Sequence, residues 1–331
     1  MHRPHVLPAR NTAPQAGVLF AMALVSLLLA AAPAEGAVER DGGHDGAHAH
    51  AGSDLAASRH DTSSATDAAA TWDAEWDRAH QRALLLWQGG AAPADAAKIL
   101  ALLKWAAAEG HAPSQNLLGG FHDKGRLMPR NAAEAARWYE KAARQGLASA
   151  QLNAGLMYRA GSGVPRDEAR ALHWFEQAAQ QDSPEAQYML ALMLEDGIGA
   201  DRDVAAAIGW YTRAAELGHA PSQHNLAVAY ATGAGVARNE TAAAKWYRKA
   251  AASGQPKSQL LLARALAEGR GARRNEAEAY VWAKAAAANG WSDRPLREAA
   301  NALAHRLERH LSPAQLDKAR ADAEARLKHR G

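Results

Sequence analysis

A tract near the N-terminus contains alternating His and Asp residues, whose side chains can bind metal ions. The histidines of this tract are His44, His48, His50 and His60. Imidazole is a good ligand for Zn, Cu and Ni, so a flexible tract of this kind can bind such ions. The spacing lacks the fixed ligand pattern of structural zinc sites. We therefore interpret the tract as a polar linker and predict no cofactor, with a metal-responsive module as the alternative.

Side chains that could support catalysis are sparse elsewhere. Glu195 and Asp196 are neighbouring carboxylates that could form an acid–base pair in a groove. The sequence contains no His-Glu-x-x-His, Gly-x-Ser-x-Gly or Walker pattern and no cysteine. Its Gly-rich segments, such as GSGVPRD at 161–167, follow no strand pattern and are typical of turns. We predict that the protein is not an enzyme, with a hydrolase acting on cell-wall material as the alternative.

An internal repeat of 36 residues dominates the chain. Tryptophan recurs at this step without insertion or deletion, and Gln, Ala and Gly recur in the same register. A strict period of this length indicates a helical array in which each unit packs on the next. We call the residues that share one position of the repeat a column, and the Trp column contains Trp138, Trp174, Trp210, Trp246 and Trp282.

Each unit is predicted to be a hairpin of two helices. In residues 147–182, Gln151 and Tyr158 lie on one face of a first helix, and Gly161 can take the left-handed conformation that ends it. We expect Glu134 and Glu278 to complete capping boxes. The second helices are expected to begin at side chains that cap free N–H groups, namely Asn131, Asp167, Asp203, Asn239 and Asn275.

The motif Ala-x-x-Trp-Tyr-x-x-Ala-Ala-x-x-Gly runs from Ala135 to Gly146, and Ala-x-Ala-Gln-x-Asn-x-Gly-x-x-Tyr follows from Ala148 to Tyr158. Together they resemble the Sel-one-like repeat, a relative of the tetratricopeptide repeat, over five units in residues 111–291. The resemblance implies an all-α fold, a right-handed α-solenoid of helix-turn-helix repeats with helical caps at both ends. It implies a scaffold or adaptor and no reaction.

The two ends of the array depart from the repeat. Residues 72–110 keep part of the register but hold Ala79 in the Gln column, so we predict a degenerate capping repeat. Residues 292–331 are predicted to form C-terminal capping helices that shield the last repeat. The second of these helices should begin with a capping box between Ser312 and Gln315. One apolar face is expected to contain Leu303, Leu307 and Leu311.

Columns that are the same in every unit are interpreted as architecture: Trp as packing between helices, and Gln as a donor to neighbouring backbone. Columns that vary on the first helices follow spacings of four and three, so they share one stripe, which the resemblance places on the concave surface. We predict a groove there for an extended peptide or a partner helix. The alternative is that some of these columns pack between neighbouring first helices. The predicted groove residues are Asn116, Leu152, Leu156, Arg159, Tyr188, Leu192, Glu195, His224, Val228, Leu260 and Arg264.

Residues 1–34 resemble a secretory signal peptide. Arg3 and Arg10 precede an uncharged stretch from 16 to 32, and a small-residue cleavage pattern follows. We predict a periplasmic or secreted bacterial protein. The alternative is an uncleaved anchor in the inner membrane that leaves the chain facing the periplasm. Residues 35–71 are rich in His, Gly and Ala, cannot bury a core, and are predicted to be a disordered linker.

The charge of the chain is nearly balanced. The formal net charge is +3, and loss of Arg3 and Arg10 with the signal peptide would leave +1. Such a balance argues against a nucleic-acid partner. We predict a protein or peptide partner in the cell envelope, and contact with a membrane only if the N-terminal segment stays uncleaved.

Overall fold

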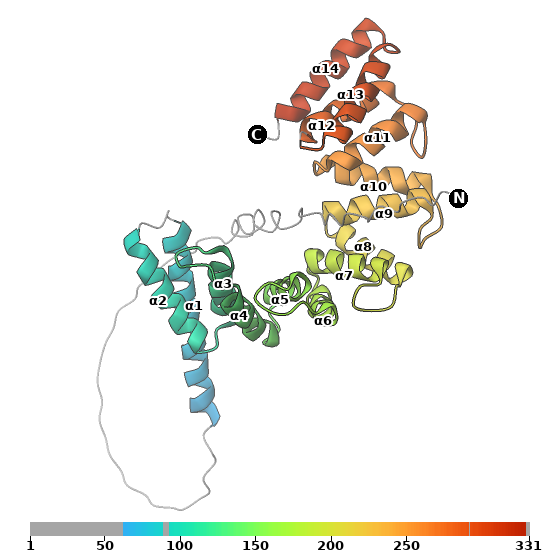
Figure 1. Cartoon of the computed structure of the whole chain (residues 1–331). Helices are drawn as coiled ribbons and strands as arrows, with labels where there is room; N and C mark the ends of the chain where they lie inside the picture. The colour runs from blue at the N-terminus through green and yellow to red at the C-terminus, as the bar shows by residue number, and fades with distance from the viewer. Residues whose placement is uncertain (1–61, 89–92, 291, 329–331) are drawn as a thin grey trace, which may run out of the picture. The chain divides into compact units, whose positions relative to one another are not determined.

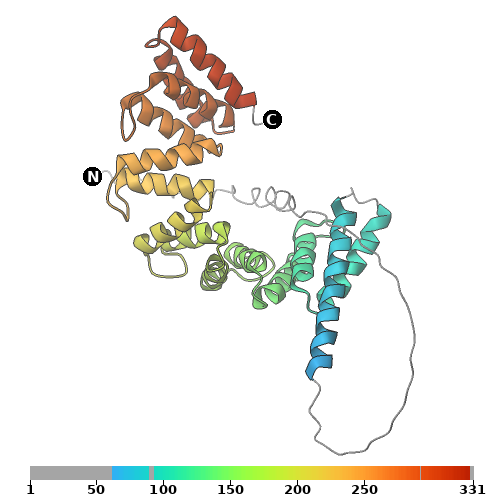
Figure 2. The ribbon, with the colours of Figure 1, turned by 180° about the vertical axis from the view of Figure 1, so that it is seen from behind.

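A computed structural model describes residues 62–88, 93–290 and 292–328 of the chain (Figure 1). Within these residues the chain forms fourteen helices and no strand, so the predicted all-α class is confirmed. Helices that follow one another pack together from α1 to α13, and Figure 2 shows the same succession from behind. The first four helices are α1 (Thr62–Gln88), α2 (Pro93–Ala108), α3 (Ala112–Lys124) and α4 (Ala132–Arg144). They are followed by α5 (Ala148–Ala160), α6 (Glu168–Ala179), α7 (Pro184–Asp196), α8 (Val204–Glu216) and α9 (Ala220–Thr232). The last five are α10 (Glu240–Ala252), α11 (Pro256–Glu268), α12 (Glu276–Asn289), α13 (Arg294–Glu308) and α14 (Pro313–Lys328).

The five repeats are the hairpins α3–α4, α5–α6, α7–α8, α9–α10 and α11–α12, and the odd-numbered helix of each is the first helix. Each first helix ends at a glycine with positive φ, as at Gly161, where φ is 65°. Inside the following loop, a Cβ on Gly163 would lie 2.1 Å from the carbonyl oxygen of Ala132 in the preceding repeat. The loop of one repeat therefore lies directly on the start of the previous second helix.

The second helices begin where the sequence predicted. The side-chain oxygens of all five Asn and Asp caps accept hydrogen bonds from the N–H group three residues on. Asp203, for example, accepts from Ala206 at 2.9 Å. Because these bonds satisfy N–H groups that have no partner inside the helix, they fix the position at which each second helix starts.

The predicted capping boxes at Glu134 and Glu278 are wrong. A capping box needs the glutamate to accept from the backbone N–H of the cap residue. The N–H of Asn131 donates instead to the carbonyl oxygen of His122 in the first helix, at 2.9 Å, and the last repeat makes the equivalent bond. The hairpin therefore satisfies this donor itself. The glutamate side chains contact other partners, as in the bond from Arg137 to Glu134.

At the N-terminal end, α1 begins at Thr62, so residues 62–71 are helical and do not belong to a disordered linker. This segment is rich in alanine, which favours helix even without large apolar side chains. The predicted signal peptide and the remainder of the linker lie outside the described residues. In the predicted capping repeat, α2 packs on α3, and the Gln115 amide donates to the carbonyl oxygen of Ala107.

At the C-terminal end, Leu303 and Leu307 of α13 are buried, and Leu311 packs against the same core. The backbone N–H of Ser312 donates to Oε1 of Gln315 at 3.0 Å, and the hydroxyl oxygen of Ser312 accepts from the backbone N–H of Gln315 at 3.4 Å, so this capping box is confirmed. Helix α14 then packs on α12. None of the described helices is long and apolar enough to cross a bilayer.

Candidate binding surface on the first helices

The predicted groove residues lie on the first helices α3, α5, α7, α9 and α11, and we call this set the variable stripe. Nine of the eleven side chains are half-buried, Leu260 is buried, and Arg264 is exposed. Half-burial means that each side chain divides its surface between neighbouring helices and solvent. Whether the stripe forms a groove stays a prediction.

Apolar residues of the variable stripe pack partly on the cores of the repeats. Leu152 and Leu156 contact the core cluster that contains Phe175. Tyr188 and Leu192 contact the next cluster along the array. Part of each side chain is therefore structural, as expected if some of these columns pack between helices. The remaining surface is open to a partner.

Polar residues of the stripe join successive first helices. Asn116 donates to the Ser149 hydroxyl at 3.3 Å and accepts from the Asn153 amide at 2.9 Å. Nδ1 of His224 lies 2.8 Å from the hydroxyl of Ser258. These contacts hold the polar side chains in defined positions, so the stripe presents an ordered polar surface between its apolar residues.

The ionisation of two groups at the stripe follows from their surroundings. Burial, followed by the nearby ammonium of Lys257, lowers the pKa of His224, so its ring is neutral at pH 7. Burial and a hydrogen bond to Glu195 at 2.7 Å raise the pKa of Tyr211. This bond occupies one oxygen of the carboxylate that the sequence suggested as a partner for Asp196, which is exposed.

One column that the sequence reasoning did not select lies beside the variable stripe. It precedes the column of Leu156 by three positions, so it shares the same helix face, and all its residues are half-buried. The spacing of three was a signal that could have identified it. Asparagine occupies two of its five positions, and this repetition resembles an architectural column more than a variable one. Its members are Leu117, Asn153, Met189, Asn225 and Leu261.

Near the C-terminal end of the stripe, Tyr188 and His224 line a pocket of about 330 Å³. Lys257 and Asp293 line the same pocket and supply one charge of each sign. Asp293 is engaged as the N-cap of α13, where it accepts from the N–H of Leu296 at 3.1 Å. The stripe thus borders a polar pocket.

The Gln column is architectural, as predicted. The amide of each repeated Gln donates to an alanine carbonyl in the preceding second helix, at 2.9 to 3.2 Å. In three repeats its Oε1 also accepts from an amide side chain 30 residues on. In the other two, Leu217 and Ser253 occupy that place, and Oε1 of Gln187 and of Gln223 is buried without a hydrogen-bond partner among the described residues.

The Trp column packs between repeats, as predicted. Trp174, Trp210 and Trp246 each contact the core clusters of two successive repeats. Cations cover several rings, and Nζ of Lys249 lies 4.1 Å from the centroid of Trp246. Trp282 is buried in the last repeat, with 3% of its surface exposed.

An acid–His–Ser grouping between α1 and α3 resembles the order of groups in a hydrolase triad. Asp77 lies 3.0 Å from Nε2 of His111, and Nδ1 of His111 lies 2.8 Å from the Ser114 hydroxyl. A similar grouping of Glu, His and Ser222 links α7 to α9. Both serines are fully buried. Because a nucleophile must reach its substrate, these groupings are structural and give the hydrolase alternative no support.

Metal-binding side chains are the remaining candidates for chemistry. Across the residues that the structure describes, no group of three or more His, Cys, Asp or Glu is placed to hold a metal ion. The tract from His44 to His60 lies outside those residues, so metal binding there stays an alternative suggested by the sequence.

Comparison with known proteins agrees with the repeat geometry. The Sel1 repeat model matches residues 112–147, 148–183, 184–219, 220–255 and 256–291. A protective antigen present in uropathogenic Escherichia coli strains, displaying an SLR fold, is 31% identical with a TM-score of 0.67, over 80% of this chain and 56% of that chain. The chain thus spans little more than half of the antigen's length. No curated protein matches this sequence significantly.

A Sel1 repeat protein from Oxalobacter formigenes is 28% identical with a TM-score of 0.61, over 75% of this chain and 96% of that chain. In the present chain, each family match starts within one residue of a first helix and includes one complete hairpin. The five matches of 36 residues cover 180 of the 331 residues. The chain therefore belongs to the Sel1 repeat family, whose fold is commonly a scaffold for protein–protein interaction.

Proposed function

We propose that the protein is an exported, non-enzymatic adaptor that binds a protein or peptide of the cell envelope along the variable stripe. The observation that carries the proposal is the contrast between columns on the same first helices. The Gln column is the same in all five units and is buried, whereas the stripe changes from unit to unit and keeps part of its surface exposed. Architecture explains the first pattern, and recognition of a partner explains the second.

The chemistry of the stripe suggests the kind of partner. Leu156, Leu192 and Val228 form a half-buried apolar row along three successive first helices. Fixed polar groups accompany this row, among them Asn116 and His224. A partner segment with apolar side chains and hydrogen-bonding groups, either extended or helical, would match such a surface.

The proposal is tested by capture from an envelope extract with the wild-type chain and with a variant carrying Tyr188→Glu and Leu192→Glu. Each substitution places a carboxylate at a half-buried position of the stripe. The two carboxylates should abolish retention of the partner, because binding would remove their hydration without supplying a positive charge. Arg264→Glu provides a second variant, since this exposed residue of the stripe can change charge with little risk to folding.

Leu85→Glu is the matched control. Leu85 is 69% exposed and lies on α1, outside the five repeats, so the same kind of substitution is made away from the stripe. Helical content measured by circular dichroism must be unchanged in every variant. Retention of the same partner by wild type and by both stripe variants would contradict the assignment of the binding surface.

Export is proposed from the sequence of the N-terminal segment. Arg3 and Arg10 precede the apolar stretch, and small residues follow it. The mass of the chain purified from a bacterial periplasm should correspond to a mature protein that begins near Glu35. A full-length mass in the membrane fraction would favour the uncleaved anchor instead.

A further inference from the structure

The last repeat differs from the other four on the outward face of its second helix. At the position just before the repeated Trp, the first four units carry Arg137, His173, Gly209 and Lys245. The fifth unit carries Val281, which is 7% exposed. At the position three residues after the Trp, the first four units carry Lys141, Gln177, Arg213 and Lys249, and the fifth carries the buried Ala285. Helix α12 thus has an apolar face where the other second helices meet solvent.

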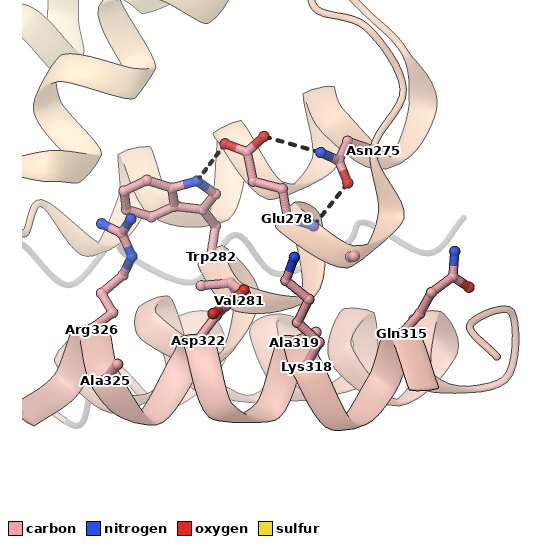
Figure 3. Close-up of a pocket in the computed structure, with 11 residues that line it drawn as sticks. Asn275, Glu278, Val281, Trp282, Gln315, Lys318, Ala319, Asp322, Ala325 and Arg326 are labelled. Atoms are coloured by element: carbon pink, nitrogen blue, oxygen red, sulfur yellow. Dashed lines mark hydrogen bonds between the residues drawn. The ribbon is translucent and has the colours of Figure 1, made fainter. Parts of the chain in front are cut away.

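Helix α14 covers this face but does not fill the space above it. Its buried residues are Ala319 and Ala323, which have the smallest side chains available for packing. A pocket of about 820 Å³ remains between α12 and α14 (Figure 3). Val281 and Trp282 line the α12 side, and Arg326 approaches the Trp282 ring from α14. A helix that only sealed the array would fill this volume with large apolar side chains, because protein interiors are close-packed.

Hydrogen bonds and ion pairs already occupy the carboxylate of Glu278 at this pocket. It accepts from Nε1 of Trp282 at 3.2 Å and from the Asn275 amide at 3.4 Å, and it forms an ion pair with Arg248. Figure 3 shows Glu278 between Asn275 and Trp282. Its charge is therefore compensated within the protein.

The free charges at the pocket come from α14. Lys318, Asp322 and Arg326 follow one another at steps of four, so they share one helix face, and their sum is +1. The guanidinium of Arg326 lies 3.9 Å from the Trp282 ring, and its Nε is buried without a hydrogen-bond partner. Stacking on the ring fixes the plane of the guanidinium, whose edge remains a donor for a carboxylate, sulfonate or phosphate.

We propose that the pocket between α12 and α14 binds a small organic anion, with its apolar body over Val281 and its anionic group at Arg326. The pocket volume lies within the range of about 300 to 1,000 Å³ that is usual for small-molecule sites. This site is separate from the variable stripe and does not depend on the adaptor function.

The test compares two dyes that share a ring system and differ in charge. The anion 8-anilinonaphthalene-1-sulfonate and the neutral N-phenyl-1-naphthylamine are titrated into the full chain, and bound dye is measured by fluorescence. The wild type should bind the sulfonate at least about tenfold more tightly, since charge-assisted hydrogen bonds typically contribute that much. Arg326→Gln should remove most of this preference.

Val281→Trp should abolish binding of the sulfonate by filling the pocket. If Val281→Trp disturbs folding, Arg326→Gln still tests the proposed anion site. Lys328→Gln is the matched control, because it removes a positive charge from the same helix at a residue that does not line the pocket, and it should bind like wild type. Leu192→Glu, on the variable stripe, should also leave dye binding unchanged. Equal affinity of wild type for the two dyes, no binding of the sulfonate, or unchanged binding in both pocket variants would overturn the proposal.

Discussion

At the level of single side chains, the Gln column joins each repeat to the one before it. Each amide ties a first helix to the end of the preceding second helix, but the carbonyl oxygen is satisfied in only three of the five units. Buried polar atoms usually have a partner, and leaving one without costs about 1 to 3 kcal/mol. Gln187 and Gln223 are therefore local weaknesses in an otherwise regular array.

Leu217→Gln should restore the missing bond to Gln187, by analogy with the 2.7 Å bond from Gln145 to Gln115. We expect the free energy of unfolding to rise by about 1 kcal/mol. The reverse change, Gln145→Leu, recreates the defect in the first repeat and should lower stability by a similar amount. Urea unfolding measures both, and midpoints that do not move in opposite directions would show that this bond does not limit stability.

The same residues show what sequence reasoning could reach. A polar residue repeated in every unit predicts a bond to backbone, and that prediction is confirmed. The second bond depends on the residue 30 positions away, and only the packing of the hairpin shows that Gln145 lies beside Gln115. The buried, unpaired oxygens could not be predicted, because periodicity does not report what faces a side chain across the hairpin.

At the level of helices, small residues set how closely the two helices of a hairpin approach. A Cβ on Gly155 of α5 would lie 2.6 Å from Cε1 of Phe175 in α6. Gly155→Ala should destabilise the protein by about 1 to 3 kcal/mol, because the ring has no free space in which to move. Gly209→Ala is the control within α8, where a new Cβ meets no atom within 4 Å. This control should stabilise the protein by about 0.5 to 1 kcal/mol. Thermal unfolding measures both variants, and equal shifts of their midpoints would contradict this packing.

The contact between α1 and α3 predicts a dependence on pH. Nδ1 of His80 lies 3.0 Å from the Ser114 hydroxyl. Burial, followed by the nearby His111, lowers the pKa of His80 from 6.5 to about 4, and Asp77 opposes this change. Between pH 6.5 and 4 the unfolded chain binds this proton more readily than the folded chain, so stability falls as pH falls. In His80→Gln, the thermal midpoint should therefore decrease less over this range than in wild type.

The exposed residue His173 supplies the control for this pH dependence. His173→Gln should leave the dependence as it is in wild type. If the two substitutions alter the dependence equally, burial of His80 is not its cause. The substitution acts at the N-terminal end of the array, because the grouping of Asp77, His80, His111 and Ser114 lies between α1 and α3.

Helix boundaries were well predicted because local chemistry sets them. The five Asn and Asp caps and the glycine ends of the first helices need only their own neighbourhood in sequence, and both are confirmed. The capping boxes failed for a non-local reason, since the N–H of Asn131 has a partner in the first helix of the same hairpin. The start of α1 at Thr62 was not predicted, because the prediction for this segment relied on its lack of large apolar side chains and did not consider the helix propensity of its residues.

At the level of the whole molecule, repetition explains why the fold was predictable. Each repeat contacts its neighbours, so a correct prediction for one hairpin predicts the structure of most of the array. The variable stripe could be placed on the first helices for the same reason. Its half-burial, the neighbouring column of Met189 and the pocket between α12 and α14 could not be predicted from the sequence, because they depend on side-chain volume and on departures from the repeat.

The most direct measurement of partner binding is amide hydrogen exchange of the wild-type chain with and without the partner recovered by capture. If the variable stripe is the binding surface, exchange should slow on α5, α7 and α9, with little change on α6 and α8. The pattern should disappear with the Tyr188→Glu and Leu192→Glu variant. Slower exchange confined to the second helices, with the first helices unchanged, would contradict the proposed binding surface.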